Sequence, residues 1–87
     1  MTFHITYEIS PERRNGAQKR FKETGAPPPA GVTMIGRWHC AQGLKGFMVV
    51  ESTDATAIAK FAQDWSDLLS FEITPVVSDE ELAGVIG

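Results

Sequence analysis

The order in which strand-like and helical segments follow one another is the strongest constraint on how this chain folds. Four segments have the alternating apolar pattern, or the β-branched and aromatic content, that is typical of β-strands: residues 3–9, 32–40, 47–52 and 70–77. Helix signals mark residues 11–24, residues 55–69 and the C-terminal end. The resulting order, β-α-β-β-α-β with a short C-terminal helix, predicts an α+β, ferredoxin-like fold with an antiparallel four-stranded sheet.

Each predicted helix has recognisable end signals. Ser10 before a proline starts the first helix, and Gly25 can end it. Asp54 is placed to cap the second helix, and Ser78 with Glu81 forms a capping box for the last one. Three consecutive prolines before the second strand predict a stiff connector that returns the chain to the sheet.

The length of 87 residues predicts a single domain, residues 1–87, with a small core that needs further support. Cys40 is the only cysteine, so a disulfide within the chain cannot supply that support. We therefore expect a homodimer.

A single cysteine fits a reducing cytoplasm, no apolar run reaches the ~20 residues of a membrane span, and the first residues lack a signal-peptide pattern. We expect a cytoplasmic protein that does not bind membranes.

The net charge of −3 argues against nucleic acid as a partner. The charges are unevenly placed, because every basic residue except Lys60 lies in the first 48 residues while most acidic residues follow. Such a chain can associate with itself through charge complementarity, or it can simply carry solvated helix faces of opposite sign.

Alternation along the strands assigns side chains to the two faces of the predicted sheet. One face is apolar, and we expect the helices to cover it. It consists of Phe3, Ile5, Tyr7, Met34, Gly36, Trp38, Phe47, Val49, Phe71 and Ile73. The other face mixes apolar and polar residues, which suits packing against the sheet of a second copy. The expected dimer interface consists of His4, Thr6, Ile35, Arg37, His39, Met48, Val50, Glu72 and Thr74.

Several stretches carry a resemblance to a known group of proteins. They read PPP-x-G-V, G-R-W-H, W-S-D-L-L and F-E-I-T-P-V, and they extend over nearly the whole chain. The sequence resembles the dimeric α/β-barrel superfamily, in which two ferredoxin-like sheets pack face to face. Within it, the chain is similar to a branch of small bacterial proteins known only as a domain of unknown function. The resemblance implies a fold and a dimer but no activity, since relatives include cofactor-independent monooxygenases, haem-degrading monooxygenases, lactone isomerases and stress-response proteins.

Four aromatic residues are expected between the sheet and the helices, where proteins of this superfamily bind substrates: Tyr7, Trp38, Phe61 and Trp65. They can form the walls of a pocket for a small, flat, apolar or aromatic ligand, or they can serve as core packing. Gly36 in mid-strand either leaves space above the sheet, as the floor of such a pocket, or marks a bulge.

The only histidines, His4 and His39, both fall on the mixed face of the prediction. Their strands would lie two strand spacings apart, roughly 9–10 Å, whereas a metal–nitrogen bond is about 2 Å long. We therefore expect no metal site, and no motif predicts a cofactor. Cys40 would face the other side as a buried, inert thiol.

Arg37 and Glu72 share the mixed face at opposite edges of the predicted sheet. They would be far apart within one chain but could meet across a face-to-face dimer, which predicts an intersubunit ion pair. Alternatively, Arg37 holds the carboxylate of a ligand.

The function predicted from sequence is therefore that of a small-molecule-binding or structural module, with no reaction identified. The alternative is a small cofactor-independent enzyme, monooxygenase- or isomerase-like, that uses the cavity between sheet and helices.

Overall fold

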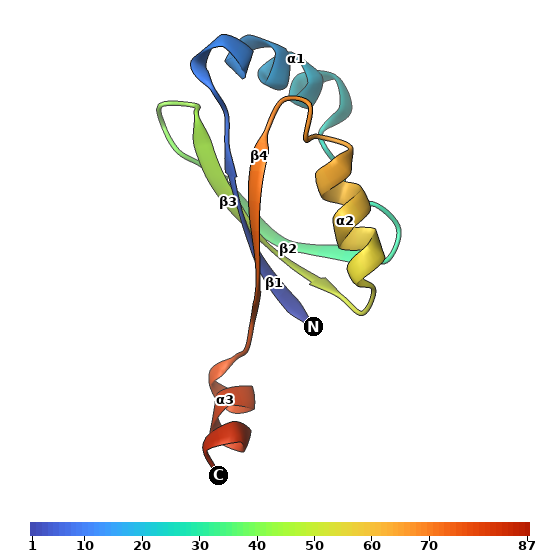
Figure 1. The fold of residues 1–87 in the computed structure, drawn as a ribbon, viewed down its shortest axis with the longest axis vertical. Helices are drawn as coiled ribbons and strands as arrows, with labels where there is room; N and C mark the ends of the chain where they lie inside the picture. The colour runs from blue at the N-terminus through green and yellow to red at the C-terminus, as the bar shows by residue number, and fades with distance from the viewer.

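The computed structural model describes residues 1–87. Its elements in chain order are β1 (Thr2–Glu8), the 3₁₀ turn η1 (Pro11–Arg13), α1 (Arg14–Thr24), β2 (Val32–His39), β3 (Lys45–Ser52), α2 (Ala55–Gln63), β4 (Ser70–Val76) and α3 (Asp79–Ile86). The strands form one antiparallel sheet in the order β2-β3-β1-β4. In Figure 1, α2 lies beside the sheet, α1 crosses its upper end, and α3 projects beyond the body. The predicted α+β, ferredoxin-like fold is confirmed.

The helix ends follow the local signals except at the first helix, where Ser10 precedes the 3₁₀ turn η1 and its side chain makes no capping hydrogen bond. Gly25 ends α1 with a left-handed φ of 71°, and the Asp54 side chain accepts a hydrogen bond from the backbone N–H of Thr56 at 2.9 Å. Ser78 and Glu81 form the reciprocal capping box of α3. The second helix is shorter than expected, because beyond residue 63 the backbone continues in consecutive turns up to residue 68 rather than as α-helix.

A β-bulge changes which side chains of β2 face the helices. Met34 pairs with Val50, but Gly36 pairs with the adjacent Val49, so β2 carries one extra residue. One extra residue reverses the alternation for the rest of the strand. Beyond the bulge, Arg37 therefore faces the helices, whereas Trp38 is 52% exposed on the opposite, open face. The predicted faces of this half of β2 were wrong.

The predicted faces of β3 were also wrong. Residues 47–50 are apolar without interruption, so their own pattern does not define an inner face. Pairing with β1 decides the matter: Met48 lies opposite Ile5 and Val50 opposite Phe3. Met48 and Val50 are consequently buried under the helices, and Phe47 lies on the open face.

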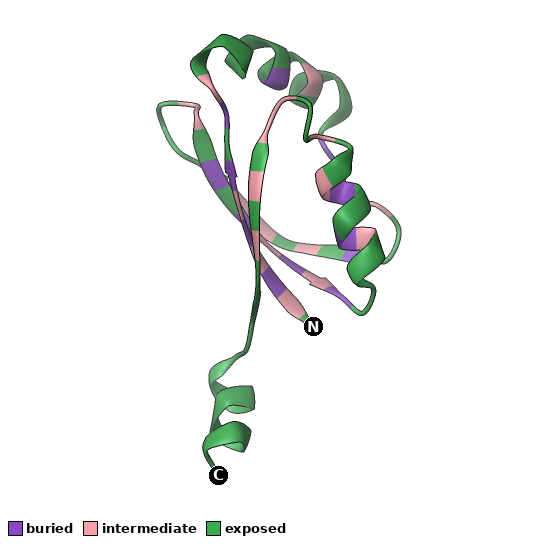
Figure 2. Ribbon diagram, in the orientation of Figure 1, coloured by how far each residue is buried: buried purple, intermediate pink, exposed green.

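The core is small, since only 13 of the 87 residues are buried. Most of it lies between the sheet and α2, with a second group around Ala17 of α1. In Figure 2 the buried residues line the strands and the inner side of α2, while α3 is exposed along its whole length. None of the helices is both long enough and apolar enough to cross a membrane.

Candidate functional site

A cavity of about 180 Å³ lies between the helices and the helix-facing side of the sheet. Its wall combines five aromatic side chains with smaller apolar residues and a few polar groups. The lining residues are Tyr7, Ile9, Ala17, Gln18, Phe21, Ala26, Arg37, His39, Gly43, Met48, Phe61, Trp65, Leu69 and Phe71. Of the pocket residues expected from sequence, Tyr7, Phe61 and Trp65 are therefore brought together here, and Gly36 and Trp38 are not.

Tyr7 is held against the sheet by the absence of a side chain on β3. A Cβ atom at Gly46, its cross-strand partner, would collide with the phenol ring. The ring is 9% exposed, and its hydroxyl lies 2.5 Å from Nδ1 of His39. Burial raises the pKa of Tyr7, and the neighbouring Cys40 raises it further, while Arg37 acts in the opposite direction. The phenol therefore stays protonated at neutral pH and can donate to the imidazole.

His39 lies at the exposed rim of the cavity, at the end of β2. Its ring meets Phe21 edge-on, with centroids 5.3 Å apart. Partial desolvation lowers the pKa of His39, and the charge of Arg37 lowers it further. The Tyr7 hydroxyl and Nδ1 of His39 share one hydrogen bond, and the tautomer of the imidazole sets which of them donates. Tyr7 and His39 together form a neutral pair that can pass a proton.

Arg37 is half-buried in the same wall. Nη1 donates to the carbonyl oxygen of Ala26 at 2.8 Å, and Nη2 donates to that of Gly25 at 3.0 Å. The guanidinium carbon lies 5.0 Å from the ring centroid of Phe21. Burial lowers the pKa of Arg37, and Tyr7 partly offsets this, but a guanidinium remains charged at neutral pH. The cavity therefore has one permanently charged wall residue.

Gly36 and Trp38 belong to the open face of the sheet instead. The Trp38 indole covers Gly36, where a Cβ atom would collide with it, and stacks on Phe47 with centroids 5.2 Å apart. Phe47 in turn lies 5.7 Å from the His4 ring. Gly36 thus marks the bulge, one of the two expected possibilities, and is not a pocket floor.

The bulge also separates the expected interface residues. His4, Thr6, Glu72 and Thr74 remain on the open face, and Ile35 at the bulge is exposed. The helix side instead holds Arg37, His39, Met48 and Val50. The predicted intersubunit ion pair between Arg37 and Glu72 was therefore wrong, because the two residues lie on opposite faces of the sheet.

Two other predictions on single residues are changed by the geometry. His4 and His39 lie on opposite faces rather than on one, and no group of three or more His, Cys, Asp or Glu side chains is close enough to hold a metal. Cys40 is exposed rather than buried, since it lies just beyond the end of β2.

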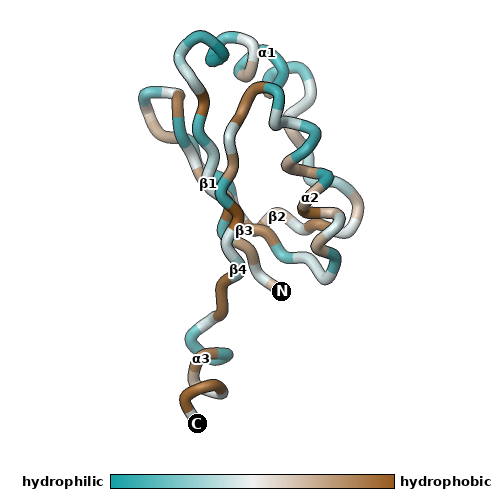
Figure 3. Tube along the Cα trace, in the orientation of Figure 1, coloured by the Kyte–Doolittle hydropathy of each residue, from teal (hydrophilic) through white to brown (hydrophobic).

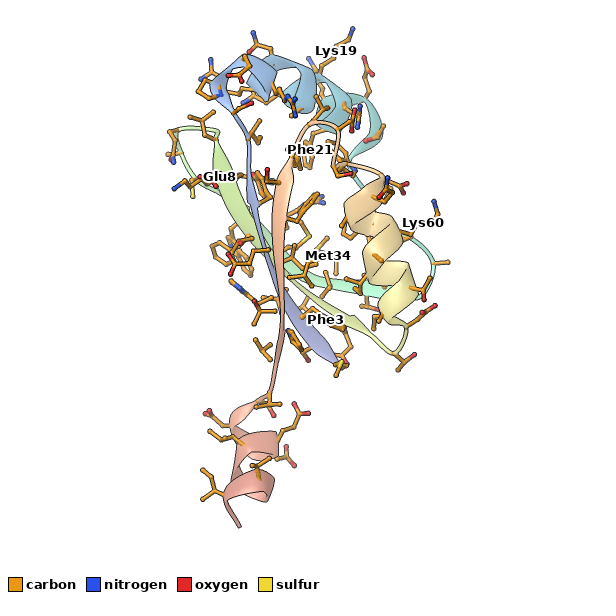
Figure 4. The ribbon with its side chains drawn as sticks, in the orientation of Figure 1. Phe3, Glu8, Lys19, Phe21, Met34 and Lys60 are labelled. Atoms are coloured by element: carbon orange, nitrogen blue, oxygen red, sulfur yellow. The ribbon has the colours of Figure 1, made fainter.

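Sequence reasoning missed several residues of the cavity, among them Gln18, Phe21 and Ala26. Phe21 had a usable signal, because it follows buried Ala17 by one helical turn and so shares the inner face of α1. In Figure 4, Phe21 points from α1 toward the sheet, whereas Lys19 points away from it. Arg37 and His39 had no such signal, because the bulge reversed their side of the strand.

The fold and the site define a small ferredoxin-like α+β domain with an aromatic cavity on the helix side of its sheet. The family model described as "Domain of unknown function (DUF3303)" matches residues 1–87, so the chain belongs to that family. No curated protein matches the sequence. The family description assigns no activity, and any function has to be argued from the site.

Proposed function

We propose that the protein binds a small, flat, largely apolar molecule in the cavity between the sheet and the helices. The observation that carries this proposal is the cavity wall itself, which combines five aromatic rings with the polar side chains of Gln18, Arg37 and His39. An apolar cavity of about 150 Å³ can take one benzene molecule. The volume of about 180 Å³ therefore suits a single substituted ring.

Binding can be tested with toluene as a neutral one-ring probe, followed by amide chemical shifts of labelled protein. We expect saturable shifts around Ala17 and Leu69, which line the cavity, and none around Trp38 on the other face. Ala17→Leu should fill the space and abolish the shifts. Ala55→Leu, an exposed helical control, should leave them unchanged. Shifts that are absent, or that survive in Ala17→Leu, would favour a purely structural module.

We also propose that the protein is a homodimer through the open face of the sheet, in the bacterial cytoplasm. Trp38, Phe47 and Ile35 are 52%, 39% and 61% exposed there, a large apolar area for a small monomer. A groove of about 500 Å³ on the same face includes His4, Thr6 and Glu72 in its lining. The proposed location in the bacterial cytoplasm is supported by the sequence resemblance and by the single, exposed cysteine.

The C-terminal arm adds to the exposed apolar surface. Val85 and Ile86 of α3 are 78% and 76% exposed, and Figure 3 shows this hydrophobic end lying away from the body.

Light scattering at micromolar concentration should give twice the chain mass. Phe47→Asp should shift the protein to monomer, whereas Thr56→Asp, at an exposed position of α2, should not. A monomeric wild type would refute the dimer.

An enzyme is the second candidate, favoured by the 2.5 Å hydrogen bond between Tyr7 and His39 in the cavity wall. An isomerisation that moves a proton needs only a positioned acid and base, which this neutral pair can provide. Phenylacetaldehyde, a one-ring compound with exchangeable α-hydrogens, is a suitable probe. We expect faster exchange of these hydrogens in D₂O with the wild type than with Tyr7→Phe. Equal rates would remove this candidate, as long as toluene still binds both proteins.

A further inference from the structure

Among the cations that take part in no ion pair, Arg37 is the only one that is not exposed; the others are Arg13, Arg14, Lys19 and Lys22. Ion pairs join Arg20 with Asp67, Lys45 with Glu8, Lys60 with Asp64, and the N-terminal amine with Glu51. Arg37 has no acidic partner, and its two hydrogen bonds go to neutral backbone carbonyls. A half-buried charge without a counterion is costly, so the site favours an incoming anion.

The rest of the cavity wall has the same electrostatic bias. None of its lining residues is an aspartate or a glutamate. The other polar side chains of the wall, Tyr7, His39 and Gln18, can each donate a hydrogen bond. Tyr7 and His39 are already hydrogen-bonded to each other, whereas the remaining N–H groups of Arg37 are not used by any hydrogen bond within the protein. A cation with free donors, set in an aromatic wall, is complementary to a carboxylate attached to a ring.

We propose that the ligand of this cavity is a small aromatic carboxylate, with its carboxylate on Arg37 and its ring among Phe61, Trp65 and Phe71. This inference rests on the proposed binding function and narrows it to one chemical class. The hydrogen bonds from Arg37 to the Gly25 and Ala26 carbonyls have a structural use as well, since they fasten the chain just after α1. They also hold the guanidinium in place before a ligand arrives, which reduces the ordering cost of binding.

The experiment compares benzoate with benzamide, its neutral analogue of nearly the same shape. Trp38→Phe leaves Trp65, in the cavity wall, as the only indole, so its fluorescence reports binding. At constant ionic strength and neutral pH, we expect benzoate to bind at least about tenfold more tightly than benzamide. The preference should weaken as salt is raised.

Variants locate the charge that is responsible. Arg37→Met should reduce benzoate affinity at least about tenfold and leave benzamide affinity nearly unchanged. Lys19→Met removes the same charge from the outer side of α1 and should alter neither. Far-UV circular dichroism checks that each variant is folded, and Arg37→Gln replaces Arg37→Met if the latter is not. The comparison of benzoate with benzamide in the protein that retains Arg37 does not depend on any Arg37 variant.

The possible outcomes distinguish failure of the carboxylate assignment from failure of the proposed binding function. If benzamide and benzoate bind equally well, and Arg37→Met affects neither, the carboxylate assignment is overturned while the cavity remains a binding site. If neither probe nor toluene binds, the binding function itself fails. Equal losses in Arg37→Met and Lys19→Met would show that overall charge, rather than Arg37, attracts the anion.

Discussion

The two faces of the sheet use the same local arrangement, an aromatic ring lying across a glycine, with opposite results. On the helix side, Tyr7 covers Gly46, is buried, and contributes its hydroxyl to the cavity wall. On the open side, Trp38 covers Gly36 and remains half in solvent. An aromatic ring over a glycine compensates for the missing side chain in either place. What lies above the ring, helices or water, decides whether it becomes core or surface.

The two faces of the sheet should differ most in the stability that is lost when an aromatic side chain is truncated to alanine. Phe61, 6% exposed and packed between α2 and the sheet, should lose about 3–5 kcal/mol of unfolding free energy on replacement by alanine. Trp38→Ala, in the monomer, should lose less than about 1 kcal/mol because the ring already meets solvent. Urea unfolding at low protein concentration measures both. Equal losses would contradict the assignment of Trp38 to the open face.

A smaller difference is expected for the two glycines. Gly46→Ala drives a Cβ atom into a ring confined by the helices and should cost about 1–3 kcal/mol. Gly36→Ala pushes only the outer end of an exposed indole, which can swing away, and should cost less than about 1 kcal/mol. Paired melting curves of the two variants test this. A reversed order would mean that Trp38 is the more confined ring.

On the open face, truncation should affect association more than folding. If the dimer forms there, Trp38→Ala should raise its dissociation constant about tenfold or more, as truncating a central aromatic does. Lys60→Ala, an exposed change on the outer side of α2, is the matched control and should have no effect. Sedimentation equilibrium gives both constants. An unchanged constant for Trp38→Ala would place the interface elsewhere.

The smallest expected effect is a pH dependence on the helix side. Because the folded-state pKa of His39 lies below its usual value of about 6.5, the unfolded chain binds the proton first on acidification. His39 therefore contributes stability above about pH 6.5 that is lost as the pH falls toward its folded-state pKa. The wild type should lose stability relative to His39→Gln between about pH 7.5 and about pH 5.5. A constant difference, measured by urea unfolding at each pH, would show that His39 is not coupled to folding.

The cavity was only partly predictable from the residues. Tyr7, Phe61 and Trp65 were identified because simple alternation and helical spacing put them on inner faces, and no irregularity intervenes. Arg37 was assigned to the open face because alternation was continued through Gly36, where the strand in fact bulges. The ligand carboxylate considered for Arg37 from sequence is therefore a proposal that the bulge makes geometrically possible.

Local sequence determined the elements of this protein and their order. The left-handed Gly25, the Asp54 cap and the Ser78–Glu81 capping box each involve groups within a few residues, so their chemistry can be read directly. These signals, with the periodicity of each segment, were enough to predict the ferredoxin-like order.

Only the tertiary structure decided which face each side chain of β2 and β3 occupies. The four apolar residues 47–50 fit either phase, and pairing with β1 selected the one that buries Met48 and Val50. One extra residue near Gly36 then moved Arg37 and His39 into the cavity and Trp38 out of it. Successive side chains of a strand point to alternate faces of the sheet, so a single inserted residue reverses the face of every side chain that follows it. The position of such a bulge is set by pairing with the neighbouring strand rather than by the sequence of the bulged strand alone.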